Sequence, residues 1–281
     1  MMCRAPQDAV SLMGWVTQAM FRSRHIITWP VLALLLAILP GCGAKVDLAA
    51  ERHAKAVKAL IDLGAEVRDV DDDVTHDQGT YVVLFREHFT PEGRVREEVL
   101  KLIREIQVLF LGVLNTPVSD DAMPDLALFP NLHALNATAT QLSDRGLKLI
   151  SASRDLRLLK LNRTHITNDG LDCLREMPSL RLLYLGDTDL SAEALQHIAK
   201  IPQLEAIKLS VLPITDDELA NLSDMPRLRF LALDGTAVTD AGLKHLDQLP
   251  ELTYLDLQNT AVSLEAIKEF RTRHPKCFVK E

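Results

Sequence analysis

The chain has 281 residues, a length that fits one or two domains, and 47% of them are hydrophobic but only 5% aromatic, which indicates a core built mainly of aliphatic side chains. The net charge at pH 7 is −8, and because Arg4, Arg22 and Arg24 outweigh Asp8 within residues 1–41, the remainder carries −10. A chain this acidic lacks the basic surface that nucleic-acid binding requires, so we expect no nucleic-acid partner.

Residues 1–41 are predicted to form a signal peptide. An apolar run over Ile26–Leu39 follows a short basic stretch. The run is shorter than the about 20 residues that a membrane-spanning helix needs, and its length and positive flank are typical of a secretory signal. A start at Met20 would give a compact leader, so both Met1 and Met20 stay open as the start of translation.

The apolar run ends in Leu39-Pro40-Gly41-Cys42, which resembles the lipobox of bacterial lipoproteins. Leu39 and Gly41 match that pattern, whereas Pro40 departs from it. The resemblance implies that Cys42 is lipidated and becomes the first residue of an exported, membrane-anchored lipoprotein of the cell envelope. An uncleaved signal anchor and ordinary secretion are the alternatives.

Residues 42–106 are predicted to form an N-terminal α/β cap that contains one degenerate repeat. We expect a helix over 48–63, strands over 66–70 and 81–85, and a second helix over 95–106. The apolar stripe of the first helix is predicted from the helical spacing of Ala54, Val57, Leu60, Ile61 and Leu63.

Residues 107–263 contain seven copies of a 24-residue repeat. Each copy is identified by one position, here called the reference position, which is occupied by Thr116, Thr140, Thr164, Thr188, Leu212, Thr236 and Thr260. Leucine-like residues stand eight, five and three places before it, as in Leu180, Leu183 and Leu185, and the alternation of positions five and three fits a half-buried strand. A fixed period of this length indicates a solenoid, in which no copy buries its own apolar face.

The second half of each copy is predicted to form a short helix. Three places after the reference position stands a hydroxyl residue in every copy: Ser119, Ser143, Thr167, Ser191, Thr215, Thr239 and Ser263. Such a residue can cap a helix N-terminus, and the aspartate that often follows suits the helix dipole. The recurring threonine is predicted to bond the backbone of the inter-strand turn, which makes a ladder along the array.

The segment Thr164-His-Ile166-Thr167-Asn-Asp-Gly170-Leu171 carries a family resemblance. It resembles the leucine-rich repeat of the ribonuclease-inhibitor-like, F-box-associated subclass, and the likeness spans about residues 84–277. The resemblance implies an α/β fold, a right-handed solenoid with parallel strands on its concave face and short helices on its convex face. It also implies a non-enzymatic module that binds a protein or peptide on the concave face. We expect this module to be a monomer.

The variable residues of each strand are predicted to line the concave face. They lie six, four, two and one places before the reference position and alternate with the core leucines, so we expect them to point to solvent. A row formed by Leu158, Leu182, Phe230 and Tyr254 would be an exposed apolar patch of the kind that marks partner sites. Aromatic residues there are expected to anchor the partner, and charged ones to orient it. The predicted partner-binding residues are Lys160, Arg163, Tyr184, Lys208, Phe230, Asp234, Tyr254 and Asp256.

The sequence carries no recognisable catalytic motif, since it has no Gly-rich phosphate loop, no H-E-x-x-H and no C-x-x-C. The histidines occupy different positions of the repeat, so they do not stack into a metal cluster. The acidic segment Asp71–Gly79 lacks the spacing of an EF-hand and is predicted to be a solvated turn. Cys173 and Cys277 lie four copies apart, too far for a disulfide. We therefore predict no catalytic residue, no metal and no cofactor.

Residues 264–281 are predicted to close the array as a C-terminal cap, with one last helix after which the chain departs from the repeat. The function expected from these features is protein binding by a module tethered at the cell surface or envelope. Two alternatives stay open: a substrate adaptor of the F-box-like type, and an enzyme whose site lies within residues 64–106.

Overall fold

The structure is a computed structural model that describes residues 48–71, 78–127, 129 and 131–281. The predicted signal peptide, Cys42 and most of the acidic turn lie outside the described residues. No helix in the described ranges is long and apolar enough to cross a membrane.

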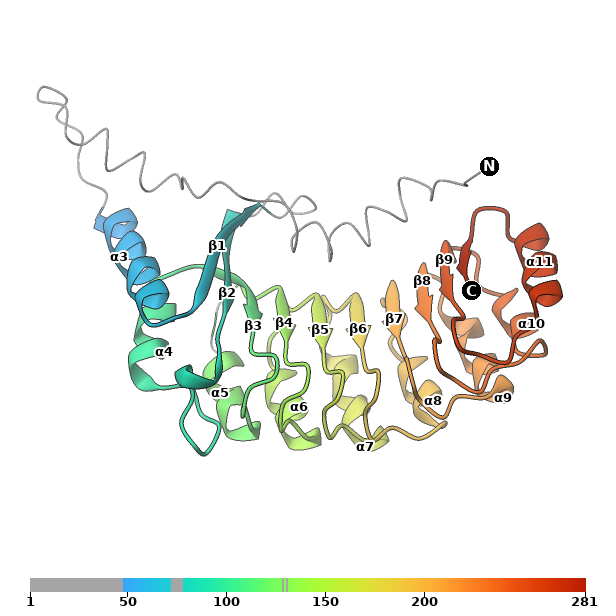
Figure 1. Cartoon of the computed structure of the whole chain (residues 1–281), viewed down its shortest axis with the longest axis horizontal. Coiled ribbons are helices and arrows are strands. Elements are labelled where there is room, and N and C mark those ends of the chain that lie inside the picture. The colour runs from blue at the N-terminus through green and yellow to red at the C-terminus, as the bar shows by residue number, and fades with distance from the viewer. Residues whose placement is uncertain (1–47, 72–77, 128, 130) are drawn as a thin grey trace, which may run out of the picture.

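Ten strands form a single sheet in which neighbours in the chain are neighbours in space (Figure 1). The first strand pairs antiparallel with the second, and every later pair is parallel. The strands are β1 Glu66–Asp71, β2 Gln78–Val83, β3 Val108–Gly112, β4 Ala134–Asn136, β5 Leu158–Lys160, β6 Leu182–Tyr184, β7 Ala206–Lys208, β8 Phe230–Ala232, β9 Tyr254–Asp256 and β10 Phe278–Lys280.

Helices alternate with these strands and cover one side of the sheet (Figure 1). The α-helices are α3 Leu48–Asp62, α4 Glu97–Arg104, α5 Met123–Ala127, α6 Asp144–Ile150, α7 Asn168–Leu171, α8 Ala194–Ile198, α9 Asp216–Leu219, α10 Leu243–Leu246 and α11 Leu264–Arg273. The strands line the inner side of a shallow arc, and α5 to α9 lie on its outer side. The predicted α/β class with a parallel sheet is confirmed, and this arrangement is compatible with a solenoid.

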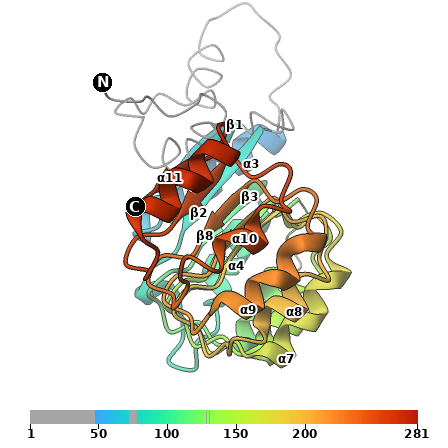
Figure 2. The ribbon, with the colours of Figure 1, turned by 90° about the vertical axis from the view of Figure 1, so that its right-hand side faces the viewer.

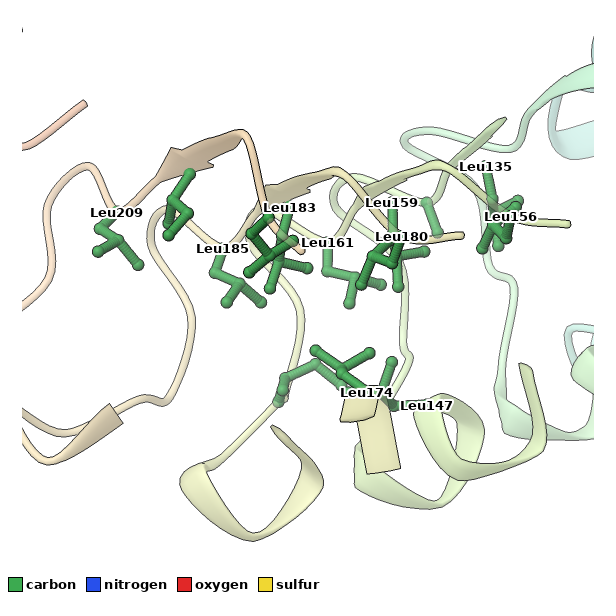
Figure 3. Close-up of a cluster of buried hydrophobic side chains, with 14 of the residues drawn as sticks. Leu135, Leu147, Leu156, Leu159, Leu161, Leu174, Leu180, Leu183, Leu185 and Leu209 are labelled. Carbon is green, nitrogen blue, oxygen red and sulfur yellow. The ribbon is translucent and has the colours of Figure 1, made fainter. Parts of the chain in front are cut away.

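The core lies between the sheet and the helical layer. Leu180, Leu183 and Leu185, which stand eight, five and three places before their reference position, are all 0% exposed. Figure 3 shows such strand leucines pointing toward those of the helical layer, among them Leu159, Leu161, Leu183, Leu147 and Leu174. The assignment of the inward face of each strand is therefore confirmed.

Each reference threonine bonds the backbone of its own copy. Its hydroxyl donates to the carbonyl oxygen three residues earlier at 2.5 to 2.8 Å, as Thr164 does to Leu161. The residue just before the reference position has a positive φ of 54° to 72° in every copy. This left-handed residue turns the chain so that the hydroxyl meets that carbonyl. The predicted turn bond is confirmed, but each bond stays within its own copy, so these hydroxyls do not form the predicted ladder between copies.

The hydroxyl residues that begin the helices connect neighbouring copies. Asp144 accepts both the backbone N–H and the hydroxyl of Thr167 in the next copy, at 2.8 and 2.6 Å. The same paired bonds join Asp120 to Ser143, Asp216 to Thr239 and Asp240 to Ser263. Helix capping by the hydroxyl is weaker, with Ser143 and Ser263 accepting backbone N–H groups at 3.3 and 3.2 Å. The aspartate that the sequence pattern attributed to the helix dipole is thus an inter-copy acceptor.

This series of inter-copy bonds is interrupted between β6 and β7. Ala192 stands where four other copies have the accepting aspartate and where another has Asn168, whose amide accepts the N–H of Ser191 and donates to its hydroxyl. In the next copy the N–H and hydroxyl of Thr215 bond to Glu218, in their own copy, at 3.0 and 2.6 Å. We call this junction the seam.

The N-terminal elements follow in the predicted order, α3, β1, β2 and α4, but β2 begins three residues and ends two residues earlier than the predicted strand over 81–85. One detail of the first helix differs. Leu60 of the predicted stripe is buried, but Ile61 and Leu63 are 50% and 41% exposed, and α3 buries Ala56, which the predicted stripe did not include. The predicted apolar stripe is therefore rotated toward Ala56.

The C-terminal segment contains a strand that was not predicted. After α11 the chain forms β10, which pairs in parallel with β9 and places Phe278 beside Tyr254. Figure 2 shows α11 lying apart from α8 and α9, toward the sheet side of the molecule. The predicted last helix is confirmed, but the sheet continues for one strand beyond it.

Candidate partner-binding surface on the sheet

The sheet surface opposite the helices, here called the inner face, carries the predicted binding residues. Residues four places before the reference position stand in one row, because the parallel register pairs Lys160 with Tyr184 and Tyr184 with Lys208. All three side chains are half-buried. The structure therefore brings these three predicted residues together across β5, β6 and β7.

The ammonium group of Lys160 lies over the ring of Tyr184, 5.1 Å from its centroid. This is a cation–π contact. Burial, and then the positive charge of Lys208, lower the pKa of Lys160 to about 8, and burial raises the pKa of Tyr184 to about 12. Neither lysine forms an ion pair with any residue that the structure describes.

An apolar row borders these three residues. Leu158 and Leu182 stand six places before their reference positions, pair in register and are half-buried. Ala206 follows them on β7 and is 1% exposed. The lysines and the tyrosine thus lie beside an aliphatic strip on the same face.

Phe230 and Tyr254 belong to an aromatic stack at the C-terminal end of the sheet. Their ring centroids are 4.4 Å apart with planes 6° apart, and Phe278 stacks on the other side of Tyr254 at 5.8 Å. Phe230 is half-buried, whereas Tyr254 is only 4% exposed. The expectation that Tyr254 points to solvent is wrong, because β10 covers it with Phe278.

The two predicted aspartates of the inner face have partners within the chain. Asp256 is 6% exposed and pairs with Lys280 on β10 at 2.9 Å. Asp234 accepts the hydroxyl of Ser210 at 2.6 Å. The expectation that Asp256 is a solvent-facing specificity residue is wrong for the same reason as for Tyr254, since the unpredicted strand supplies its partner.

A signal for β10 was present in the sequence. The segment Phe278–Lys280 follows Tyr254–Asp256 by the repeat distance of 24 residues. It was missed because Lys276 and Glu281 stand where the repeat has leucines eight and three places before the reference position. The 24-residue spacing thus continues into this segment, but two of the three leucine positions that identify a copy do not.

Arg163 lies at the edge of the inner face, in the turn that follows β5. Its side chain is exposed, and its φ is +55°, a left-handed conformation. The neighbouring Asn162 accepts the backbone N–H of Gly186 at 2.8 Å, which fixes this turn against the next copy. Arg163 is thus presented to solvent beside the row of Lys160.

A groove of about 470 Å³ lies elsewhere, between α10 and α11. Its lining combines acidic and basic groups: Asp240, Leu243, Lys244, Asp247, Ser263, Glu265, Ala266, Glu269 and Arg273. Two of these carboxylates already have partners, since Asp240 binds Ser263 and Asp247 binds His274 and Arg273. Glu265 also pairs with Lys268, which leaves Lys244 and Glu269, of opposite charge, as the charged lining residues without an ion pair among the described residues.

In the region proposed for an alternative catalytic site, His88 is the one buried titratable group among the residues whose burial the structure describes. Its Nδ1 lies 2.8 Å from the backbone N–H of Phe85, and its Nε2 lies 3.1 Å from the carbonyl oxygen of Leu63. These contacts fasten the end of α3 to the segment after β2, which is a structural role. Within the described ranges, no group of three His, Cys, Asp or Glu side chains is placed to hold a metal ion.

Comparisons with protein-family models and with curated proteins found no match to this chain. Its function is therefore inferred from the geometry of the inner face.

Proposed function

We propose that this chain is a leucine-rich-repeat module that binds a protein partner on its inner face and is tethered to the cell envelope through lipidated Cys42. In this proposal the array is a right-handed solenoid, the sheet is its concave recognition surface, and the module performs no catalysis itself.

One observation carries the binding proposal. Lys160, Tyr184 and Lys208 form a continuous row on three adjacent strands, and none of them contributes to the leucine core. Tyrosine is enriched at the energetic centre of protein interfaces. A half-buried lysine without a carboxylate partner is costly to the free protein, which supports a role outside folding.

The anchor proposal is supported by the sequence that precedes α3. Cys42 precedes Leu48, the first residue of that helix, by six positions. A chain of this length reaches at most about 20 Å, so a lipid on Cys42 would hold the N-terminal end of the array close to the membrane. Three acyl chains, as expected of such lipoproteins, would make the attachment stable, whereas one chain binds only marginally.

Site-specific photo-crosslinking in the native host tests the binding proposal. A photoreactive amino acid in place of Tyr184 is expected to crosslink a distinct protein. The same amino acid in place of Glu193, an exposed residue just before α8, is the matched control and should give no such product. Crosslinking from position 193 but not from position 184 would place the partner on the helical side and refute the proposal.

Metabolic labelling with a radioactive fatty acid tests the anchor. The wild-type chain should carry the label, and Cys42→Ala should lose it and stay in the uncleaved form. Equal labelling of the two proteins, or a mature N-terminus at another residue, would contradict lipidation at Cys42.

A further inference from the structure

The lysine row has an unusual charge environment. Lys160 and Lys208 occupy the same position on β5 and β7, with Tyr184 of β6 between them. Neighbouring strands lie about 4.8 Å apart, so the two lysine backbones are separated by roughly 9.6 Å. Their charges repel each other at this distance, and burial beside the aliphatic strip of Leu158 and Leu182 reduces the screening by water.

No acidic side chain among the residues that the structure describes forms an ion pair with Lys160 or Lys208. Asp256 is neutralised by Lys280, and Asp234 is engaged by the Ser210 hydroxyl. Exposed Asp187 lies at the turn after β6 and forms no ion pair with a described residue. Although the whole chain carries a charge of −8, the centre of its inner face therefore presents unpaired positive charge.

We infer that the partner presents an extended acidic segment whose carboxylates, three residues apart, bind the ammonium groups of Lys160 and Lys208 on either side of Tyr184. This inference rests on the proposed function and names the chemistry of its partner. Bound carboxylates would remove the repulsion between the lysines and supply the ion pairs that both lack, which is the electrostatic complementarity seen in specific interfaces.

The spacing of the lysines favours a particular peptide geometry. A polyproline II helix has three residues per turn and rises about 3.1 Å per residue, so side chains at i and i+3 lie on one face about 9.3 Å apart. This matches the roughly 9.6 Å between the lysine strands. The methylene groups of two such glutamates would lie on the strip of Leu158 and Leu182, and the residues between them on the ring of Tyr184.

A protein segment fits this surface better than a nucleic acid. Apart from the two lysines, Arg163 is the basic residue at the same end of β5, and Asp187 and Asp234 lie nearby. Nucleic-acid binding depends on many phosphate contacts by a broad basic surface. A pair of lysines beside an aliphatic strip instead suits two carboxylates with aliphatic stems.

Fluorescence anisotropy with labelled peptides tests the inference on the full-length protein. The probe is a peptide of Glu-Pro-Pro repeats, which holds the polyproline II conformation and places a carboxylate at every third residue. The matched controls are a Gln-Pro-Pro repeat, a Glu-Pro repeat with carboxylates at every second residue, and a short oligothymidine. We expect binding of the Glu-Pro-Pro peptide that weakens with salt, with the controls at least about tenfold weaker.

Three substitutions locate the binding site. Lys160→Met and Lys208→Met keep the aliphatic stem and remove the charge, and each should weaken Glu-Pro-Pro binding about tenfold. Lys148→Met, on the exposed side of α6, should leave it unchanged. Thermal unfolding of all three variants verifies that they remain folded. An independent readout is acetylation at neutral pH, in which the peptide should protect Lys160 from the reagent and leave Lys148 reactive.

Several results would overturn the inference. These are absent binding of the Glu-Pro-Pro peptide at low ionic strength, equal loss of binding in Lys148→Met, no protection of Lys160, or equally tight binding of oligothymidine. If a partner crosslinks through position 184 but binds Lys160→Met and Lys208→Met as tightly as the wild type, the proposed function stands and the acidic-segment inference fails. If no partner crosslinks there and the peptide still binds at the lysines, the surface binds acidic segments but the proposed function fails.

Discussion

The ammonium group of Lys160 is held over an aromatic ring, next to a like charge and away from carboxylates. The pKa of this group falls from 10.5 to about 8 because burial and then Lys208 disfavour its charge. The other groups facing it are Asn136 on β4 and Tyr184 on β6, and the pKa of Tyr184, about 12, keeps that phenol neutral at physiological pH. Lys160 thus opposes folding as long as it is charged.

Replacement of Lys160 by methionine should therefore stabilise the free protein. The cost of the charge is fully present below the folded pKa of about 8 and disappears as pH rises toward the unfolded value of 10.5, because the folded protein then binds fewer protons than the unfolded chain. We expect Lys160→Met to raise the free energy of unfolding by about 1 kcal/mol near pH 7, and by much less near pH 10. Urea denaturation at the two pH values measures this, and an equal or opposite difference would contradict it.

The left-handed residue before each reference position gives a second prediction for single residues. Val211 adopts a φ of +61° although its side chain is branched at Cβ, and it is 62% exposed. Valine is strained in this region, whereas glycine is not. We expect Val211→Gly to raise the free energy of unfolding by about 1 kcal/mol. Val211→Ala is the control, since it keeps the Cβ and should gain less, and a loss of stability in Val211→Gly would show that the apolar contact outweighs the strain.

At the scale of elements, neighbouring copies are joined by a unit of three residues. Asp144 bonds the N–H and hydroxyl of Thr167, and Gly170 lies so close that a Cβ there would be 2.2 Å from the Asp144 carboxylate. Glycine recurs at this place beside Asp120 and Asp216 as well. The Thr-Asn-Asp-Gly part of the repeat therefore reflects contact between copies as well as the start of a helix.

Gly170→Ala should destabilise the protein by about 1–3 kcal/mol, since the new methyl group displaces the Asp144 carboxylate. Asp144→Ala should cost about 1–3 kcal/mol by leaving the N–H and hydroxyl of Thr167 without their acceptor. In the double variant the methyl group added at position 170 meets no carboxylate, so the combined loss should be smaller than the sum. Denaturant unfolding of the four proteins measures this, and strictly additive losses would show that the two residues do not interact.

The fold of the seven copies was predictable, because every copy contains the same local pattern. The leucines eight, five and three places before the reference position are buried as expected, and strand alternation fixes the side of positions five and three. The inner face was only partly predictable. Whether Tyr254 and Asp256 are free depends on Phe278 and Lys280 in the adjacent strand, whose copy lacks the leucines that would have revealed it. Whether an inner-face side chain is paired depends on residues of the neighbouring copy, and the pattern of a single copy does not contain this information.

The seam between β6 and β7 gives a prediction for the whole molecule. In a repeat array, stability is the sum of the stabilities of the copies and of the interfaces between neighbours. The seam lacks the paired bonds to the hydroxyl residue of the next copy, so we expect it to be the weakest interface between neighbouring copies. Ala192→Asp combined with Glu218→Gly would introduce the aspartate and glycine that are found together at three of the other junctions. We expect the combination to raise the free energy of unfolding by about 1–2 kcal/mol. Ala192→Asp alone should gain less, because its carboxylate meets Glu218.

Hydrogen exchange measured by mass spectrometry checks the same seam. Amides before Ala192 and after Thr215 should show separate opening free energies in the wild type and a common one in the combined variant. A single cooperative opening in the wild type would contradict a weak junction.

The seam has a consequence for recognition, because it passes between Tyr184 and Lys208. A ligand that binds both Lys160 and Lys208 contacts the copies on both sides of the seam and therefore links them across the weakest interface. Part of the binding free energy would then appear as cohesion between the two halves of the array, since any ligand that binds only the joined state stabilises it. Binding of a partner would thereby slow the opening of helices at the far ends of the molecule, which the ligand does not contact.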